Sequence, residues 1–323
     1  MDDFRIPIGA WAKVGVDWIK ENLDGLLDVI AMVARWLVSS LTDVLVATPI
    51  PVAIAIAALI GLLVRSWQLA LGTVVTFVLV VGMGQWESAM QTLALVIVAT
   101  VVAVVIAVPL GIWSARSDRV RAVLKPVLDF MQTMPAFVYL IPAIVFFSIG
   151  VVPGLVATVI FALPPGVRFT ELGIRGVDPE TVEAGQAFGA KPGQILRGIQ
   201  LPLAMPTIMA GINQVIMLAL SMAVIAGMAG ADGLGKQVVE AISTINLPKG
   251  VEAGLSVVII AVYLDRVTAA LGNPGEYRSS LLGVLSRRRA ARRNAAAEEA
   301  MAAARSIPAV AGAPFAPESA SVS

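Results

Sequence analysis

The sequence predicts an all-α, polytopic membrane protein. Of its 323 residues, 58% are hydrophobic and 14% are charged, whereas soluble domains carry about 25% charged and roughly 45–50% apolar residues. The mean hydropathy is +0.87, and because aromatic residues make up only 6%, the excess is aliphatic, which suits helices that face lipid chains. The chain has no cysteine and no histidine, which excludes disulfides, thiol nucleophiles, Cys/His zinc sites and histidine acid–base chemistry. A net charge of +1 gives no reason to expect a nucleic-acid partner.

About seven stretches are apolar enough to be transmembrane helices, and the range extends from six to eight because several are short. A spanning helix needs about 20 mostly apolar residues. Only residues 65–68, which include Arg65, Ser66 and Trp67, separate the first two stretches, which predicts a tight hairpin with a snorkelling arginine and an interfacial tryptophan. The expected spans are residues 49–64, 69–82, 90–113, 130–149, 151–167, 206–229 and 253–264.

Basic residues predict how these spans are oriented. Arginine and lysine are concentrated in the connections 114–129 and 168–205 and in the C-terminal tail, whereas the opposite connections hold only Lys236 and Lys249. Cytoplasmic loops of membrane proteins are enriched in these residues. We therefore expect the C-terminus in the cytoplasm and the N-terminus on the extracytoplasmic side.

Three regions are expected along the chain. In residues 1–47, Trp11, Val14 and Trp18 recur at helical spacing opposite charged residues, which predicts an amphipathic helix in the membrane interface. The alternative is an eighth span at 29–47, which would bring Arg35 and Asp43 into or near lipid. Residues 48–272 form the membrane domain. The Ala/Arg-rich segment 273–323 is predicted to be a disordered cytoplasmic tail.

The expected spans contain no ionisable side chain in their interiors. Because such residues mark ion pathways in pumps and secondary transporters, a proton-coupling or sodium-coupling site is not expected, although backbone carbonyls alone can bind sodium. The stretch 230–236 reads G-x-x-x-x-G-K but lacks the following Ser or Thr and a preceding strand, so it is interpreted as a turn and not as a phosphate loop. If the chain moves a solute uphill, the energy has to come from outside the bilayer. A carrier or channel without an ATPase partner is the alternative.

The connection 168–205 has the clearest local signals in the chain. Asp178, Pro179 and Glu180 are typical of a helix N-cap, first helical residue and acidic first turn. Gly189 is expected to end this short helix, and Pro192 to begin a second one. Two short helices projecting from the cytoplasmic face would form a knob that docks into a groove of another protein.

Within this connection, the stretch EAGQAFGAKPGQILRGIQLP (183–202) resembles the EAA signature of permease subunits of ABC importers. Gly185 departs from the usual third alanine, but both residues are small. The similarity extends over about 90–272 and is greatest to glycine betaine/proline betaine permeases, in the stretches 131–150, 160–174, 201–230 and 264–272. The positions that match the signature are Glu183, Ala184, Gly189, Ile199, Leu201 and Pro202.

This resemblance implies a homodimeric permease in the bacterial cytoplasmic (inner) membrane that imports an osmoprotectant. Two cytoplasmic ATPase subunits would each bind one knob and would carry the ATP and Mg²⁺, and a separate substrate-binding protein would deliver the solute outside. The chain itself would be no enzyme and would hold no cofactor or metal. The signature residues and Gly185 would couple the permease to the ATPase, with Glu183 positioning the knob, Ala184 and Gly185 allowing close contact and Gly189 making the turn.

A quaternary ammonium solute would be bound by aromatic faces through cation–π attraction. Aromatic residues are concentrated in the fourth and fifth spans, although ordinary helix packing is the competing interpretation. Asn213 is a further candidate for contact with the solute, and the competing interpretation is an interhelical hydrogen bond. The small residues Ala219, Ala223 and Gly227 recur every four positions and are expected to pack within one subunit or at a dimer axis. The candidate residues of the solute pathway are Phe137, Tyr139, Phe146, Phe147 and Asn213.

Overall fold

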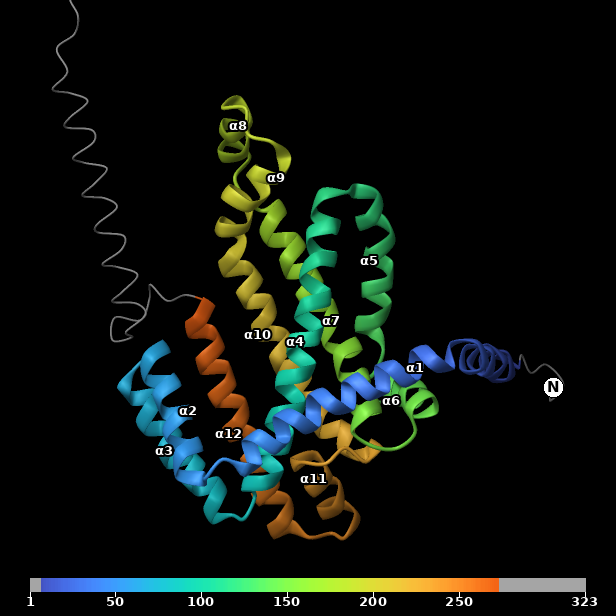
Figure 1. Ribbon diagram of the computed structural model, residues 1–323, viewed down its shortest axis with the longest axis vertical. Coiled ribbons are helices and arrows are strands. Elements are labelled where there is room, and N and C mark those ends of the chain that lie inside the picture. Colours follow the sequence, from blue (N-terminus) through green and yellow to red (C-terminus); the bar gives the residue numbers. More distant parts are fainter. Residues whose placement is uncertain (1–6, 273–323) are drawn as a thin grey trace, which may run out of the picture.

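The computed structural model describes residues 7–272, and every regular element in this range is a helix (Figure 1). The expected all-α fold is therefore confirmed for this part of the chain. The tail predicted for 273–323 lies outside the described residues. Four helices run beside one another along the long axis of the molecule: α4 (Trp86–Arg116), α5 (Asp118–Thr133), α7 (Val151–Arg175) and α10 (Leu201–Ala226).

Small residues allow α4, α7 and α10 to pack closely. A Cβ placed on Gly211 of α10 would lie 2.5 Å from the Cβ of Phe169 on α7, and one on Gly166 of α7 would lie 2.8 Å from the Cβ of Ala107 on α4. Real Cβ atoms do not approach so closely, so these contacts require glycine. The predicted stripe of small residues on α10 is also buried within the chain, which confirms packing inside one subunit. Helices without bulky side chains at their interface gain dispersion energy over a long contact.

A second group of helices lies beside this bundle, formed by α2 (Ile50–Val64), α3 (Trp67–Gly82) and α12 (Leu247–Gly272) (Figure 1). The hairpin between α2 and α3 is as predicted, and the Ser66 hydroxyl caps α3 by accepting a hydrogen bond from the Leu69 amide at 3.3 Å. The Tyr263 hydroxyl on α12 donates to the Ala57 carbonyl on α2 at 3.1 Å. This bond ties the hairpin to the rest of the membrane domain.

The fourth expected span, 130–149, is wrong as a single straight helix. Helices α5 and α6 (Ala136–Phe147) meet at an angle of 100°. Pro135 has no amide hydrogen and disfavours a helical conformation in Met134 before it, which breaks the helix there. Residues 118–129, expected as a loop, are helical because the Ser117 hydroxyl caps α5 by accepting from the Val120 amide at 3.4 Å.

Several helices are longer than the predicted spans, and their ends carry charge. Arg168, Glu171 and Arg175 lie near the C-terminal end of α7, and Asp265 and Arg266 near that of α12. The predicted lack of ionisable groups thus applies to the shorter ranges and not to whole helices. Among the described residues, five helices have the length and composition to cross a membrane, or six if the bent pair α5–α6 counts as one span, while α2 and α3 are shorter.

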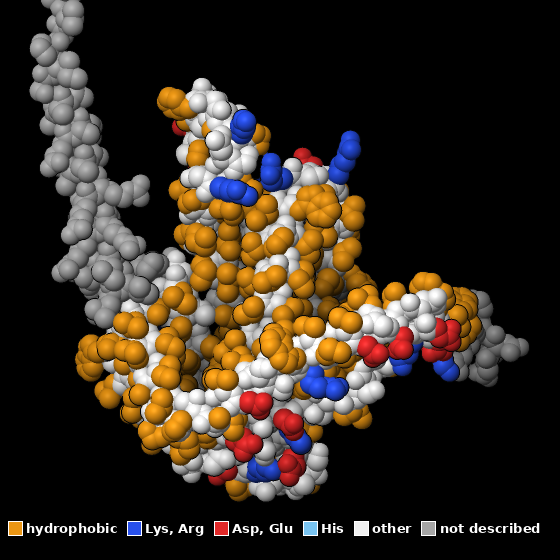
Figure 2. All heavy atoms as spheres, in the orientation of Figure 1, with side chains coloured by type: hydrophobic (Ala, Val, Ile, Leu, Met, Phe, Trp, Pro, Cys, Tyr) orange, Lys and Arg blue, Asp and Glu red, His pale blue; other side chains and the backbone are white. Residues whose placement is uncertain are grey.

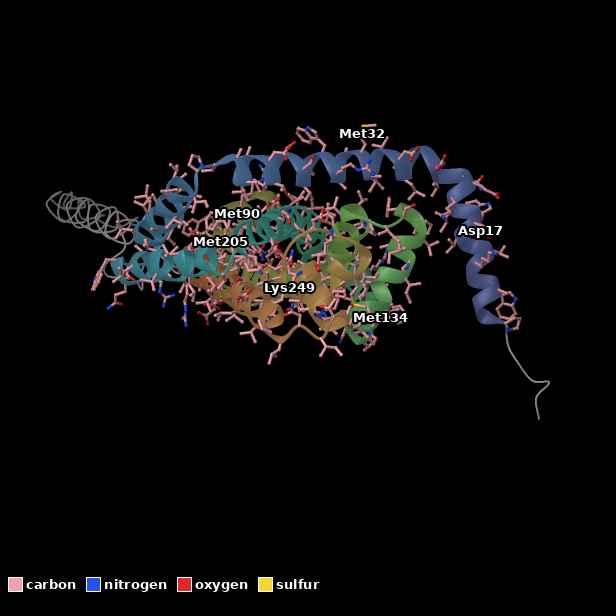
Figure 3. The ribbon with its side chains drawn as sticks, turned by 90° about the horizontal axis from the view of Figure 1, so that it is seen from below. Asp17, Met32, Met90, Met134, Met205 and Lys249 are labelled. Atoms are coloured by element: carbon pink, nitrogen blue, oxygen red, sulfur yellow. The ribbon has the colours of Figure 1, made fainter. Side chains whose placement is uncertain are left out.

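The N-terminal residues form one long helix, α1 (Ile8–Ala47), with a kink at Leu23. It lies across the bundle and not along it (Figure 1), and the view from below shows it following one edge of the molecule (Figure 3). Trp11 and Trp18 are exposed. Residues 29–47 are therefore the second half of a crosswise helix. By length and composition, this helix is also one of the five that could cross a membrane, so the interfacial placement remains a prediction.

The two ends of the bundle differ in structure and charge. At one end, α7 and α10 are joined by short helices that project beyond the bundle (Figure 1). At the other end, α10 leads through a short 3₁₀ helix (Gly227–Ala229) and a glycine-rich turn at 230–233 into α11 (Leu234–Ser243). The turn predicted for 230–236 is therefore shorter than expected, because Gly235 and Lys236 already belong to α11. Figure 2 shows mostly lysine and arginine at the projecting end, whereas most acidic side chains in this view lie along α1 and around α11.

Substituting Gly211 tests the close packing of α10 on α7. We expect Gly211→Ala to destabilise the detergent-solubilised protein by about 1–3 kcal/mol, because the new methyl group forces α7 and α10 apart. Gly254→Ala on α12 is the matched control, since nothing lies within 4 Å of its added Cβ and alanine favours a helix by roughly 0.5–1 kcal/mol. Thermal unfolding of both variants measures the difference, and equal midpoints would contradict this packing.

Candidate functional site

The short helices between α7 and α10 form a projecting knob, defined here as residues 176–200. It contains α8 (Pro179–Ala187), α9 (Pro192–Ile195) and a five-residue π-helix (Leu196–Gln200) that continues into α10. The knob is narrower than the predicted connection 168–205, because α7 continues through Arg175 and α10 already begins at Leu201. Both short helices that the sequence predicts are present.

Helix α8 begins and ends through local hydrogen bonds. The Asp178 carboxylate caps its start by accepting from the Glu180 amide at 3.0 Å. At its end, the Gly189 amide donates to the Gln186 carbonyl at 2.8 Å and the next amide donates to the Gly185 carbonyl at 3.1 Å. This pair of bonds is a Schellman motif, and Gly189 has the left-handed φ of +76° that the motif requires. The predicted cap and stop are both confirmed.

Apolar residues at the base of the knob fix it to α7 and α10. Ile195 and Leu196 are buried, and Leu196 clusters with Ile174 of α7 and with Ala204 and Ile208 of α10. The Lys191 amide donates to the Gln194 side chain at 2.8 Å, which holds the start of α9. The knob is therefore an extension of two packed helices and should move with them.

The predicted coupling residues divide into an exposed set and an internal set. A Cβ on Gly185 would lie 2.7 Å from Cδ1 of Ile199, so this glycine makes room for packing inside the knob. Ile199 and Leu201 are partly buried around the same base. Glu183 is exposed and makes no ion pair or side-chain hydrogen bond with any other described residue. The predicted coupling residues that are exposed, and so accessible to a partner protein, are Glu183, Ala184, Gly189 and Pro202.

Phe188, which lies beside the turn of the knob, is not among the predicted coupling residues. Its side chain is 93% exposed, although a large aromatic ring is normally buried. The available signal was its position: Phe188 is the C-cap residue of α8, directly before Gly189, and no residue of this nine-residue helix is buried. An isolated aromatic ring on a projecting tip is typical of an anchor that fills a pocket in a binding partner.

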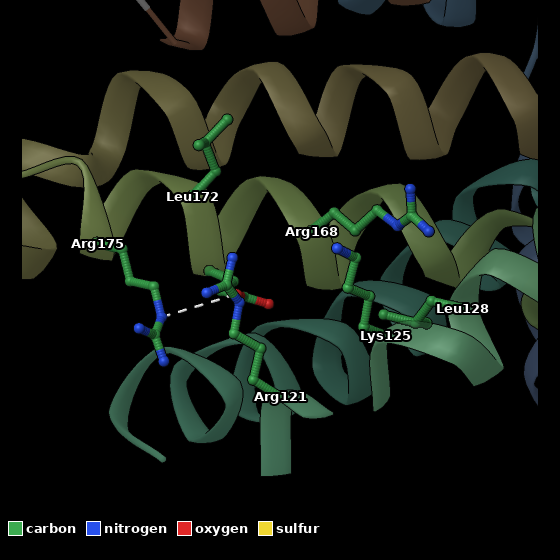
Figure 4. Close-up of a pocket in the computed structure, with 7 residues that line it drawn as sticks. Arg121, Lys125, Leu128, Arg168, Leu172 and Arg175 are labelled. Atoms are coloured by element: carbon green, nitrogen blue, oxygen red, sulfur yellow. Dashed lines mark ion pairs between the residues drawn. The ribbon is translucent and has the colours of Figure 1, made fainter. Parts of the chain in front are cut away.

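A cluster of charged residues joins α4, α5 and α7 next to the knob (Figure 4). Glu171 is at its centre: Arg121 Nε lies 2.6 Å from the carboxylate, the Ser114 hydroxyl donates to it at 2.8 Å, and Arg175 Nε lies 3.7 Å away. Arg175 also donates to the Asp118 carboxylate at 2.7 Å. These residues were assigned to loops in the sequence analysis, but they connect three helices. Only 15% of the Glu171 side chain is exposed, so its pairs are shielded from solvent more than surface pairs are.

The charged cluster borders a cavity of about 300 Å³ between α5 and α7. Lys125 and Arg168 line it together with Leu128 and Leu172 (Figure 4). Arg168 pairs with Asp129, while Lys125 forms no ion pair within residues 7–272. No group of three or more metal-ligating side chains occurs in this described part of the chain.

The aromatic candidates for a solute pathway are all on α6, and the described residues do not form an aromatic cage around a common space. Tyr139 is buried, and its hydroxyl donates a hydrogen bond to the Met131 carbonyl. Its ring packs edge-on against that of Phe161, with 5.7 Å between the ring centroids. The rings of Phe146 and Phe147 lie edge-on to each other, with 6.5 Å between their centroids. Phe137 is exposed. Tyr139 thus has a packing role, whereas the ring of Phe137 is open to a ligand or to a neighbouring molecule.

Asn213 forms the interhelical hydrogen bonds that were considered for it. Its amide donates to the Asp265 carboxylate at 3.0 Å, and its carbonyl accepts from the Thr268 hydroxyl at 2.6 Å. Both partners are on α12, so the three polar groups connect α10 to α12. A role of Asn213 in the solute pathway remains a prediction.

Comparisons with known proteins agree with this architecture. Residues 107–272 match the model of the family described as binding-protein-dependent transport system inner membrane component. The chain is 43% identical over 275 residues to the glycine betaine/proline betaine transport system permease protein ProW of Escherichia coli, covering 85% of this chain and 78% of that protein. It is 47% identical over 264 residues to the glycine betaine transport system permease protein OpuAB of Bacillus subtilis, covering 82% and 94%.

A third relative is the glycine betaine/carnitine transport permease protein GbuB of Listeria monocytogenes, at 47% identity, with 82% of this chain and 95% of that protein covered. Among solved structures, a chain of the MetNI methionine ABC transporter in an inward-facing conformation matches with a TM-score of 0.54 and 21% identity, covering 59% of this chain and 95% of that chain. This likeness supports the fold. The match over 107–272 and the identity to these relatives show that the chain belongs to the family of binding-protein-dependent transport system inner membrane components.

Proposed function

We propose that this chain is the membrane-spanning subunit of an ATP-driven importer for glycine betaine, proline betaine or a related solute. The observation that carries the proposal is the 43–47% identity to three permeases named for glycine betaine. A further relative, at 38% identity, is named for trimethylamine N-oxide. Most of these solutes share a nitrogen that bears several methyl groups and no hydrogen, so the substrate class is a small methylated amine compound.

In the proposed mechanism the knob couples the chain to an ATPase. The chain carries no site for nucleotide hydrolysis that its sequence reveals, so the energy enters through a cytoplasmic subunit that binds ATP and Mg²⁺. Phe188 fills a pocket of this subunit, and the free carboxylate of Glu183 positions the knob. Since the knob is built on α7 and α10, closure of the ATPase dimer displaces both helices. The Glu171 cluster passes this displacement to α4 and α5.

The proposed transporter has a defined orientation in the membrane and a defined set of subunits. The knob and the basic end of the bundle face the cytoplasm, in agreement with the enrichment of Lys and Arg on that side. Helix α11 is then extracytoplasmic, and α1 lies in the outer interface with its tryptophans in the headgroup region. Two copies of the chain, two ATPase subunits and one extracytoplasmic binding protein make up the transporter.

Reconstitution of the purified subunits in liposomes tests this function. We expect uptake of labelled glycine betaine only when the ATPase, internal ATP and the binding protein are all present. Competition by unlabelled proline betaine, carnitine and choline then defines the substrate. Uptake without the ATPase, driven by a sodium or proton gradient, would instead support a secondary carrier.

Phe188→Ala tests the anchor. Loss of a buried aromatic contact at an interface typically costs more than 1 kcal/mol, so we expect about tenfold weaker binding of the ATPase subunit and a matching loss of uptake. Val123→Ala on α5 is the control, because this exposed apolar residue lies outside the knob. Co-purification of the ATPase with each variant measures the effect. Unchanged binding with Phe188→Ala would rule out the anchor.

Gly189→Ala tests the shape of the knob. A left-handed conformation costs a residue with a Cβ about 1–2 kcal/mol, so we expect the end of α8 to fray and coupling to the ATPase to weaken. Gly193→Ala is the control, because it adds the same methyl group within the knob and no atom lies within 4 Å of the added Cβ. Hydrogen exchange of residues 183–195 should accelerate only in the first variant. Equal exchange in both variants is the contradictory result.

Phe137→Leu tests for a cation–π contact along the solute pathway. Such a contact at an exposed site is worth about 0.5–1 kcal/mol, which predicts a roughly 2–5-fold slower maximal uptake of glycine betaine. Ile141→Leu is the control, since it is an exposed residue of the same helix without a π face. The affinity of the binding protein for the solute should be unaffected. Equal uptake by both variants would remove Phe137 from the pathway.

A further inference from the structure

An exposed apolar patch lies where α11 turns into α12. It consists of Ile242, Ile245, Leu247 and Val251, all exposed, and it borders a groove of about 330 Å³. We call these four residues the corner patch. Figure 1 shows this corner at the end of the molecule opposite the knob, and Figure 3, which views that end, shows Lys249 of the same corner near its centre.

Ile245 occupies a backbone position that is unfavourable for it. The amide of Ile245 donates to the Ile242 carbonyl at 3.3 Å, and the Asn246 amide donates to the Ala241 carbonyl at 2.8 Å. These bonds are the Schellman motif that also ends α8, and Ile245 corresponds to Gly189 with a left-handed φ of +53°. Such a conformation is a clear outlier for a β-branched residue, and glycine is by far the preferred residue at this position.

Packing against the other described residues does not offset this cost, because the side chain of Ile245 is hardly buried by them. It is 92% exposed, the highest value among the large aliphatic residues whose burial is described. Residues that persist in strained conformations are concentrated at functional sites, where the surroundings or a partner make use of them. An isoleucine that is both strained and exposed therefore indicates a contact with another molecule.

Charged residues of both signs lie along α11 and at the start of α12. Lys249 Nζ lies 2.8 Å from the Glu240 carboxylate, and Lys236 Nζ lies 2.8 Å from the Asp232 carboxylate. The Lys249 ammonium holds the pKa of Glu240 below its usual range, and the Asp232 carboxylate raises the pKa of Lys236. An apolar centre with a charged rim is the usual composition of a protein–protein interface.

We propose that the corner patch is the surface on which the substrate-binding protein docks, with Ile245 inserted into an apolar depression of that protein. This inference rests on the proposed function, which makes this end extracytoplasmic. The family is described as binding-protein-dependent, so a globular protein has to meet this end of the chain. A second copy packed alongside in the bilayer would contact the sides of the helices, whereas the corner patch lies at their end (Figure 1).

Ile245→Gly gives opposite expectations for stability and for function. Glycine relieves the left-handed strain, so the thermal unfolding midpoint of the reconstituted transporter should rise or stay the same. Removal of the side chain should raise the concentration of binding protein needed for half-maximal ATPase stimulation at least fivefold, with basal ATPase activity unchanged. Ile245→Val keeps the strain and most of the apolar surface, and it should respond like the wild type.

Leu247→Gln provides a second test outside the strained turn and should also weaken stimulation. The inference is overturned if Ile245→Gly and Leu247→Gln are stimulated at the wild-type concentration of binding protein. It is equally overturned if Ile245→Gly separates the permease dimer while stimulation of the remaining dimer is normal, which would assign the patch to a second copy. If the binding protein fails to stimulate even the wild type, the proposed function fails, and the inference that rests on it fails as well.

Discussion

Close packing between α7 and α10 determines where the knob lies, because the knob is the connection between these two helices. Gly211 permits the ring of Phe169 to lie against α10, and buried Leu196 places the base of the knob between both helices. Protein interiors transmit displacement because they are packed as densely as molecular crystals. A force applied to the knob therefore moves α7 and α10 as a pair and does not merely bend a loop.

Charged residues extend this unit to two more helices. Through Glu171, α7 is paired with Arg121 of α5 and with Ser114 of α4. The carboxylate accepts from several donors at once, and breaking one pair would leave charge in a poorly solvated place. Asn213, midway along α10, connects this helix to α12 through Asp265. Polar bonds thus join helices for which hydrophobic attraction is weak in a lipid environment.

Features set by neighbouring residues could be predicted from the sequence, and features set by distant contacts could not. Asp178 and Gly189 predicted both ends of α8, because helix caps depend on a few adjacent residues. The bend before Pro135 was missed since the apolar run continues across it. The Glu171 cluster was missed because Ser114 and Arg121 are at least 50 positions away along the chain. The exposure of Phe188 and the strain at Ile245 depend on backbone geometry that composition does not reveal.

The side of the membrane on which the knob lies tests the account most directly. The chain has no cysteine, so Gln186→Cys introduces a unique thiol on α8, and Ser243→Cys introduces one on α11 as a control. We expect a membrane-impermeant maleimide to label the first only in inside-out vesicles and the second only in right-side-out vesicles. A bifunctional reagent should link the thiol at position 186 to the ATPase subunit. Labelling of position 186 in right-side-out vesicles, or no link to an ATPase in the active transporter, would contradict the account.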